Sequence, residues 1–243
     1  MQQIFLSQEP VDGQFLVEGS QAHHLVKVVR IRPGEKLRVS IDSGHNYICQ
    51  ALEVNDGKLT VEILKEVPST ELPNKIYLFQ AIPKGDRMET IIEKCVELGV
   101  YEIIPVAMKN CIVKLDEKKK KTRVERYRAI ATSAAEQSKR SIVPGISQVM
   151  TFKEALDYAD QLDVRLLPYE CKNGMFDTYS ALANINRGDS IGVFIGPEGG
   201  FDASEIEASK DRVTQISLGS RILRTDTAAI CTLSMLMLKC EEL

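Results

Sequence analysis

The sequence predicts an α/β protein in which a small β-barrel, residues 1–70, precedes a larger domain with a mostly parallel sheet, residues 74–243. Two observations carry this prediction. Short β-like runs with turn sequences fill the first part of the chain, whereas strand and helix patterns alternate in the second part. Between them, Val67–Asn74 is a polar segment with two prolines, which is typical of a connector between domains.

The first part contains β-like runs separated by turn sequences such as Pro33-Gly34 and Asp42-Ser43-Gly44. A short helix is expected among them, over His23–Val29. A small domain built mostly from such short runs is most simply a barrel. The predicted strands are Gln14–Val17, Lys36–Ile41, Tyr47–Val54 and Lys58–Leu64.

In the second part, apolar runs of strand length alternate with segments that have the apolar spacing of a helix. Three helices are expected to begin with a capping box, in which a short polar residue is followed three positions later by Glu. The boxes are Asp86 with Glu89, Thr151 with Glu154, and Asp202 with Glu205; two further helices are expected over Thr122–Ser138 and Thr225–Cys240. The predicted strands are Ile76–Ile82, Ile103–Val106, Val164–Leu167, Ile191–Ile195 and Ile216–Leu218.

The composition is that of an ordinary globular protein, with 44% hydrophobic and 27% charged residues in 243. The chain contains no apolar run long enough to cross a membrane, and its N-terminus does not have the pattern of a signal peptide, so we expect a cytoplasmic protein. Six cysteines without C-x-x-C spacing indicate reduced thiols. With only three histidines, we expect no metal site.

The net charge of −3 hides an uneven distribution of basic residues. Residues 109–140 contain eleven Lys and Arg against four Asp and Glu. A second basic segment lies near the N-terminus and contains Lys27, Arg30, Arg32, Lys36 and Arg38. Basic patches on an acidic protein favour selective docking on a polyanion. The alternative for the run Lys118–Lys121 is a solvated loop without a partner.

Two glycine-containing loops, Ile195–Phe201 and Leu218–Ala228, are the most informative segments. Each begins where a short apolar run stops and leads into a segment with helix-start residues. This pattern is typical of a ligand site at the carboxyl ends of sheet strands, where glycine allows the backbone to approach a ligand closely. The dinucleotide and Walker phosphate motifs are absent from the sequence, and so is the spacing of a Ser-His-Asp hydrolase. These residues alone therefore do not name a reaction.

Five segments, taken in order along the chain, resemble those of one known family. They are His23–Arg30, Lys84–Gly99, Gln137–Arg140 with Pro144, Gly196–Gly200 and Leu218–Ala228. Together they resemble the RsmE family, the 16S rRNA (uracil-N3)-methyltransferases of the SPOUT superfamily. Asp226 departs from the pattern, because the family usually has glutamate there.

This resemblance implies an α/β trefoil-knot methyltransferase domain behind a PUA-like, RNA-binding β-barrel. It implies a homodimer that binds S-adenosyl-L-methionine in the knot loops and methylates N3 of a specific uridine in 16S rRNA of the small ribosomal subunit. Two other classes stay open. One is another SPOUT RNA methyltransferase, which would act on a ribose 2′-hydroxyl, and the other is a non-catalytic RNA-binding factor of ribosome assembly.

The resemblance also implies candidate residues. For catalysis, Arg140 and Arg224, with Arg221 as a third choice, would stabilise the uracil anion or hold phosphates. Glu198 or Asp226 would accept the proton, and Glu198 could instead orient its glycine loop. The cofactor-binding candidates are Leu167, Pro168, Glu170, Ile195, Gly196, Pro197, Gly199, Gly200, Leu218, Gly219, Ile222, Leu223, Thr225 and Ala228. The RNA-binding candidates are His23, Lys27, Arg30, Arg32, Arg87, Arg140 and Arg221.

Overall fold

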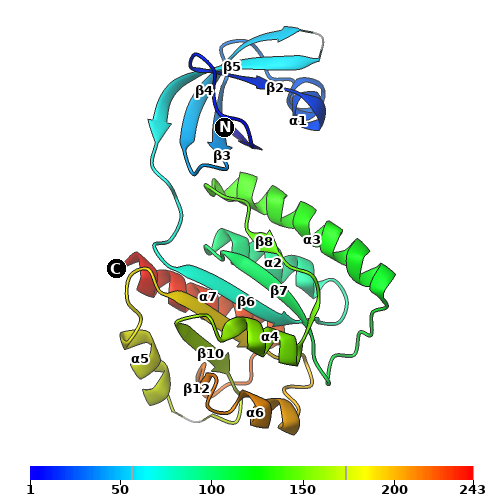
Figure 1. The fold of residues 1–243 in the computed structure, drawn as a ribbon, viewed down its shortest axis with the longest axis vertical. Coiled ribbons are helices and arrows are strands. Elements are labelled where there is room, and N and C mark those ends of the chain that lie inside the picture. The colour runs from blue at the N-terminus through cyan, green and yellow to red at the C-terminus, as the bar shows by residue number, and fades with distance from the viewer. Residues whose placement is uncertain (56, 173, 243) are drawn as a thin grey trace. The chain divides into compact units, whose positions relative to one another are not determined.

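The computed structural model describes residues 1–55, 57–172 and 174–242 and divides the chain into two compact units (Figure 1). The first unit consists of Met1–Glu71 together with Ala135–Val143. The second unit consists of Leu72–Ala134 and Pro144–Leu243. The chain therefore passes between the units three times, whereas the sequence predicted a single connector.

The first unit is built on a five-stranded sheet with the order β1-β3-β4-β5-β2. Strands β1 and β3 are parallel, and the other pairs are antiparallel. The pairing path ends at β1 and β2, so the hydrogen-bonded ladders of the described residues do not close into a ring. The strands are β1 Gln2–Leu6, β2 Gln14–Val17, β3 Lys36–Ile41, β4 Asn46–Asn55 and β5 Lys58–Val67.

Apolar side chains on one face of this sheet, including Phe15, Leu37 and Leu59, form the core of the first unit. The helix predicted over His23–Val29 corresponds to η1, His24–Val29, which has π-helical geometry. The preceding helix α1, Gly19–His23, was not predicted. Strand β1 was not predicted. It has only five residues, and their burial does not alternate along the strand, so they give no period-two signal.

The second unit is a parallel α/β sheet with the order β12-β10-β11-β6-β7-β8, and β9 also pairs with β7. All of its strand pairs are parallel, as the alternation of strand and helix predicted. The strands are β6 Lys75–Ala81, β7 Glu102–Ala107, β8 Gly145–Ile146, β9 Met150–Thr151, β10 Val164–Pro168, β11 Ser190–Ile195 and β12 Thr214–Ile216. The helices are α2 Arg87–Glu97, α3 Glu117–Ser138, α4 Phe152–Ala159, α5 Phe176–Ala183, α6 Ala203–Ser209 and α7 Thr225–Glu241. The last turn of α3, from Ala135, belongs to the first unit.

Helices cover both faces of this sheet (Figure 1). On one face, Phe79 of β6 stacks on Phe194 of β11 at 4.4 Å between ring centroids, and Phe152 of α4 meets Phe194 edge-on. Helices α2 and α7 pack against each other, and α7 also contacts β11. The central strands β6 and β11 are therefore buried on both faces, which explains their nearly continuous apolar sequence.

The capping boxes at α4 and α6 are confirmed, because Thr151 and Asp202 accept from backbone N–H groups while Glu154 and Glu205 bond back to the caps. The box predicted at Asp86 is wrong. Its side chain makes no cap hydrogen bond, and Glu89 instead donates its backbone N–H to the Asp86 carbonyl at 3.0 Å. Helix α5 was not predicted. In the part of the chain that the structure describes, none of the helices could span a membrane.

Candidate functional site

Three neighbouring strands, β11, β10 and β12, end at the same edge of the second unit's sheet. The loops that follow them, with the first residues of α2 and α7, enclose a cavity of about 620 Å³. Its volume lies in the range of small-molecule sites. Because parallel strands place their carboxyl ends together, both glycine loops reach this cavity, as the sequence predicted.

The first glycine loop, residues 196–200, is held by the protein from two sides. A turn closes it, with the Gly200 N–H donating to the Pro197 carbonyl at 2.9 Å. Asn110, from the loop after β7, donates its amide to the carbonyls of Gly199 and Gly200 at 3.3 and 3.2 Å. Gly200 has φ of +69°, a conformation that favours glycine.

A side chain at these glycines would also crowd neighbouring residues of the protein. A Cβ atom at Gly200 would lie 2.6 Å from Oε1 of Glu170, and one at Gly199 would lie 3.2 Å from Cβ of Asn110. At Gly196 the same atom would lie 3.0 Å from the Phe201 ring. Glycine therefore suits the close packing of this loop at all three positions, and the positive φ favours it most strongly at Gly200.

Glu198 is the charged residue of this loop. Its Oε1 accepts from Nη1 of Arg87 at 2.6 Å and from the backbone N–H of Lys84 at 3.0 Å. Burial opposes ionisation of this carboxyl group, but hydrogen bonds from backbone N–H groups and from Arg87 outweigh it and hold the pKa of Glu198 below its ordinary value. A carboxylate so engaged is a weak base, so this geometry favours the loop-orienting role over proton transfer.

The second glycine loop, residues 217–224, follows β12. Gly219 has φ of +100°, and its N–H donates to Oγ of Ser217 at 3.2 Å. Beyond it, Arg221 and Arg224 are exposed, and Ile222 is 87% exposed. Among the described residues, neither guanidinium has an acidic partner, so both positive charges at this rim are available to an anion.

Thr225, the first residue of α7, connects the two loops. Its hydroxyl donates to the carbonyl of Gly196 at 2.7 Å and accepts from the Gln80 amide at 3.0 Å. Sequence reasoning missed Gln80 and Asn110. Gln80 left one signal, since it is a polar residue inside the apolar run Ile76–Ile82.

Most of the predicted site residues lie together around the cavity. Those that line it are Pro168, Glu170, Ile195, Gly196, Pro197, Glu198, Gly199, Gly200, Leu218, Gly219, Arg221, Ile222, Leu223, Arg224, Thr225, Ala228 and Arg87. Leu167 is absent from this lining because its side chain is fully buried in the core. Asp226 is also absent, although one of its carboxylate oxygens, Oδ1, is buried without a hydrogen-bond partner among the described residues.

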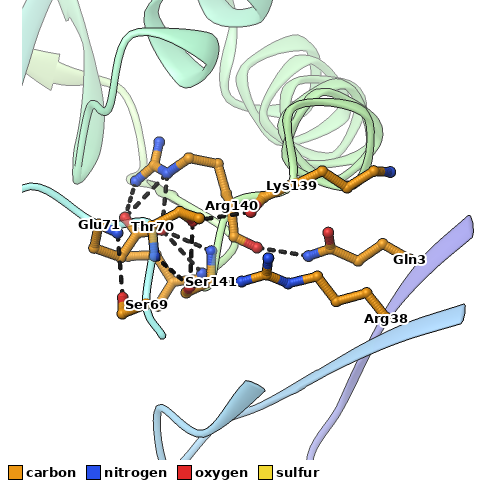
Figure 2. A network of polar contacts seen from close by, with 9 residues as sticks. Gln3, Arg38, Ser69, Thr70, Glu71, Lys139, Arg140 and Ser141 are labelled. Carbon is orange, nitrogen blue, oxygen red and sulfur yellow. Dashed lines mark hydrogen bonds and ion pairs between the residues drawn. The ribbon is translucent and has the colours of Figure 1, made fainter. Parts of the chain in front are cut away.

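Arg140 lies in the first unit, inside the polar network that Figure 2 shows. Its side chain is 4% exposed, and Nε contacts both carboxylate oxygens of Glu71 at 2.9 and 3.0 Å. Glu71 also accepts from the backbone N–H of Ser141 at 2.7 Å. The guanidinium is thus buried and neutralised. This placement favours a structural role within the unit, and the catalytic and RNA-binding roles expected for Arg140 stay predictions.

The other RNA-binding candidates of the first unit are on its surface. His23, Lys27, Arg30 and Arg32 are exposed along α1, η1 and the turn that follows. Arg38, which the sequence grouped with them, is buried and donates to Asn46 at 3.2 Å and to Ser141 at 3.3 Å. The exposed basic segment of this unit therefore ends before Arg38.

Two protein-family models match the chain. Residues 17–64 match the RNA methyltransferase PUA domain, and residues 70–237 match the RNA methyltransferase domain. The fold and the glycine-loop cavity therefore belong to an RNA methyltransferase with a PUA domain.

Relatives define the class further. The ribosomal RNA small subunit methyltransferase E of Bacillus subtilis is 36% identical over 94% of this chain and 91% of its own length. That of Mesomycoplasma hyopneumoniae is 34% identical over 95% and 96%. The chain belongs to the ribosomal RNA small subunit methyltransferase E family. A crystal structure of the Neisseria gonorrhoeae member bound to S-adenosyl methionine matches with a TM-score of 0.83 and 30% identity, covering 97% of this chain and 96% of that one.

Proposed function

We propose that this protein transfers a methyl group from S-adenosyl-L-methionine to N3 of a specific uridine in 16S rRNA of the small ribosomal subunit, in the cytoplasm. The observation that carries the proposal is the meeting of two glycine loops in one cavity at the carboxyl edge of a parallel sheet. Membership of the family supports the reaction class, and the relatives' name supports the substrate.

The residues around the cavity fit this cofactor. The glycine loops present backbone groups, Ile222 and Leu223 supply apolar surface, and Glu170 and Glu198 are the carboxylates in its lining. Such a combination of an apolar wall with a few fixed polar groups is typical of a cofactor site. When bound, S-adenosyl-L-methionine supplies an electrophilic methyl group on a sulfonium.

The chain's own residues would hold and activate the uridine. Arg224 and Arg221 at the cavity rim would stabilise negative charge on the uracil and hold adjacent phosphates, because both are exposed and have no acidic partner among the described residues. Asp226 follows the cavity-lining Thr225 in the first turn of α7 and stays the candidate for accepting the N3 proton. Glu198 would hold the first loop through Arg87.

The proposal includes a trefoil knot and a homodimer. Two features support the knot: the family, and the Thr225–Gly196 hydrogen bond, which brings the end of the second loop to the start of the first. The dimer is supported by apolar side chains that remain exposed in the second unit, such as Ile222 and Leu238. Light scattering at micromolar concentration is expected to give twice the mass of the chain, and a monomeric mass would contradict the dimer.

The reaction is tested by nucleoside mass spectrometry. Small subunits and naked 16S rRNA that lack the modification are incubated with the protein and S-adenosyl-L-methionine, with heat-inactivated protein as the control. We expect 3-methyluridine in at least one substrate. A ribose-methylated nucleoside would instead favour another SPOUT activity. No methylated product, with no cofactor binding by calorimetry, would favour the assembly factor.

A further inference from the structure

Gln80 is a polar residue at the centre of an apolar sheet. It lies on β6, is fully buried, and is adjacent to Ile195 of β11 in the strand register. Ile195 is the last residue before the first glycine loop. The strand pairing therefore places the Gln80 side chain beneath the point where this loop leaves the sheet.

The Gln80 side chain acts as a hydrogen-bond donor. Its Nε2 donates to the carbonyl of Ala81 at 2.9 Å and to Oγ1 of Thr225 at 3.0 Å. The Thr225 hydroxyl has one proton, which it donates to the Gly196 carbonyl at 2.7 Å. Gln80, Thr225 and Gly196 thus form a chain of two hydrogen bonds, the first buried and the second part-buried, in which one donor polarises the next.

The carbonyl of Gly196 is a sensitive point for the loop. The next residue is Pro197, which has no backbone N–H, so this carbonyl is the single hydrogen-bonding group of its peptide unit. A hydrogen bond to this carbonyl therefore holds the orientation of the Gly196–Pro197 peptide plane, at which the first glycine loop begins. At the other end of the chain of bonds, Thr225 is the residue at which the second loop becomes α7.

The arrangement leaves one polar atom of the Gln80 amide without a hydrogen bond. Its Oε1 is buried and has no hydrogen-bond partner among the described residues. A buried unsatisfied acceptor is unfavourable, and an apolar side chain of similar size would avoid it. A polar side chain in an apolar strand is a departure from the usual pattern that is expected near functional sites. The hydrogen bond that Gln80 donates to Thr225 explains why an amide occupies this position.

We propose that Gln80 and Thr225 are positioning residues that fix the two glycine loops relative to each other and thereby set the affinity for S-adenosyl-L-methionine. The inference rests on the proposed function, because it concerns the same cavity. Thr225 lines that cavity and Gln80 does not, so Gln80 acts through Thr225. The Thr225 hydroxyl donates its proton to the Gly196 carbonyl, so it stabilises the loops and cannot donate the same proton to a ligand.

Calorimetry with S-adenosyl-L-methionine tests the Thr225 link. Thr225→Val keeps the shape and removes the hydroxyl, whereas Thr225→Ser keeps the hydroxyl. We expect about tenfold weaker binding for the valine variant and near wild-type binding for the serine variant. The matched control is Thr232→Val on the same helix, since the Thr232 hydroxyl donates to the Ala228 carbonyl of α7 and, among the described residues, bonds to neither glycine loop. That control is expected to bind as the wild type does.

The Gln80 link is tested by Gln80→Met and Gln80→Glu. Methionine removes the donor, and a carboxylate would accept from Thr225 and draw its proton away from Gly196, so both variants are expected to bind the cofactor about tenfold more weakly. Thermal unfolding shows that each variant is folded at the temperature of the binding experiment.

The outcomes separate this inference from the proposed function. Failure of the wild-type protein to bind S-adenosyl-L-methionine overturns the function. If the wild type binds and both Thr225→Val and Gln80→Met bind equally well, the positioning role is overturned. A serine variant as weak as the valine variant also overturns it, because the hydroxyl would then not be what matters.

Discussion

The two units each contain an arginine–carboxylate pair that joins segments far apart in the sequence, but the two pairs lie in different surroundings. Arg140 and Glu71 in the first unit are 4% and 20% exposed and are enclosed by further hydrogen bonds. Arg87 and Glu198 in the second unit are 37% and 22% exposed, and both line the cavity. The first pair completes a closed network, whereas the second holds a loop at a site. Both pairs consist of an arginine and a glutamate, so their different roles follow from how deeply each pair is buried and from its other hydrogen-bond partners.

The largest expected effect comes from breaking the closed pair. Glu71→Ala leaves the buried Arg140 guanidinium without its carboxylate, and removing one partner of such a pair lowers the free energy of unfolding by about 3–5 kcal/mol. Urea denaturation followed by circular dichroism measures the loss, with hydrogen exchange at residues 139–142 to locate it. The double variant Glu71→Ala, Arg140→Met is expected to regain part of the stability. A double variant no more stable than Glu71→Ala would show that the charge is not the cause.

Changing the cavity loop should affect binding more than stability. Gly199→Val is expected to weaken S-adenosyl-L-methionine binding by at least about 100-fold, because its side chain would displace the loop from Asn110 as well as obstruct the ligand. Calorimetry measures the affinity. Wild-type affinity in Gly199→Val would exclude the loop as the cofactor site.

The exposed basic residues of the first unit should act through long-range charge, unlike the buried Arg140–Glu71 pair of the same unit. Arg30→Glu combined with Arg32→Glu is expected to weaken RNA binding about tenfold and to flatten its salt dependence, with unchanged cofactor affinity. Filter binding over a salt series measures both quantities. The matched control is Lys118→Glu combined with Lys121→Glu on α3. If only this control weakens binding, α3 is the docking surface instead.

The smallest stability effect is expected at the exposed pair. Glu198→Gln should change the free energy of unfolding by less than about 1 kcal/mol, because partly exposed ion pairs contribute little. Since folding lowers the pKa of Glu198, its contribution is complete above the ordinary carboxyl pKa and is lost as the pH falls through the lowered value. Methyl transfer should therefore show no change between pH 6 and 8 that Glu198→Gln removes. A pH dependence in this range that disappears in the variant would return Glu198 to the role of a base.

The sequence predicted the position of the cavity better than it predicted the partners of the charged and polar side chains. Both glycine loops follow short apolar strands, and that order along the chain is enough to bring them to one edge of a parallel sheet. The partner of Arg140 could not be predicted, because Glu71 is 69 positions away and no periodic pattern links the two residues. The same limit hid Asn110, which reaches a loop 89 positions further along the chain.

Local signals failed where tertiary contacts decide the outcome. Asp86 has the sequence of a capping residue, but the helix begins without it, and the neighbouring Lys84 N–H bonds instead to Glu198. Strand β1 is defined by its parallel pairing with β3, a contact across 35 positions that its own five residues do not indicate. Gln80 departs from the apolar pattern of β6 because of a hydrogen bond to α7, far ahead in the sequence.

The inclusion of residues 135–143 in the first unit makes that unit discontinuous, and this affects its modularity. A fragment cut at residue 70 lacks Glu71, Arg140 and Ser141, so Gln3 and Arg38 lose partners that they need when buried. The first 71 residues therefore do not form the complete unit by themselves, because the unit also needs residues 135–143. During synthesis from the N-terminus, it reaches its final form only after residue 143 has emerged, when more than half of the chain already exists.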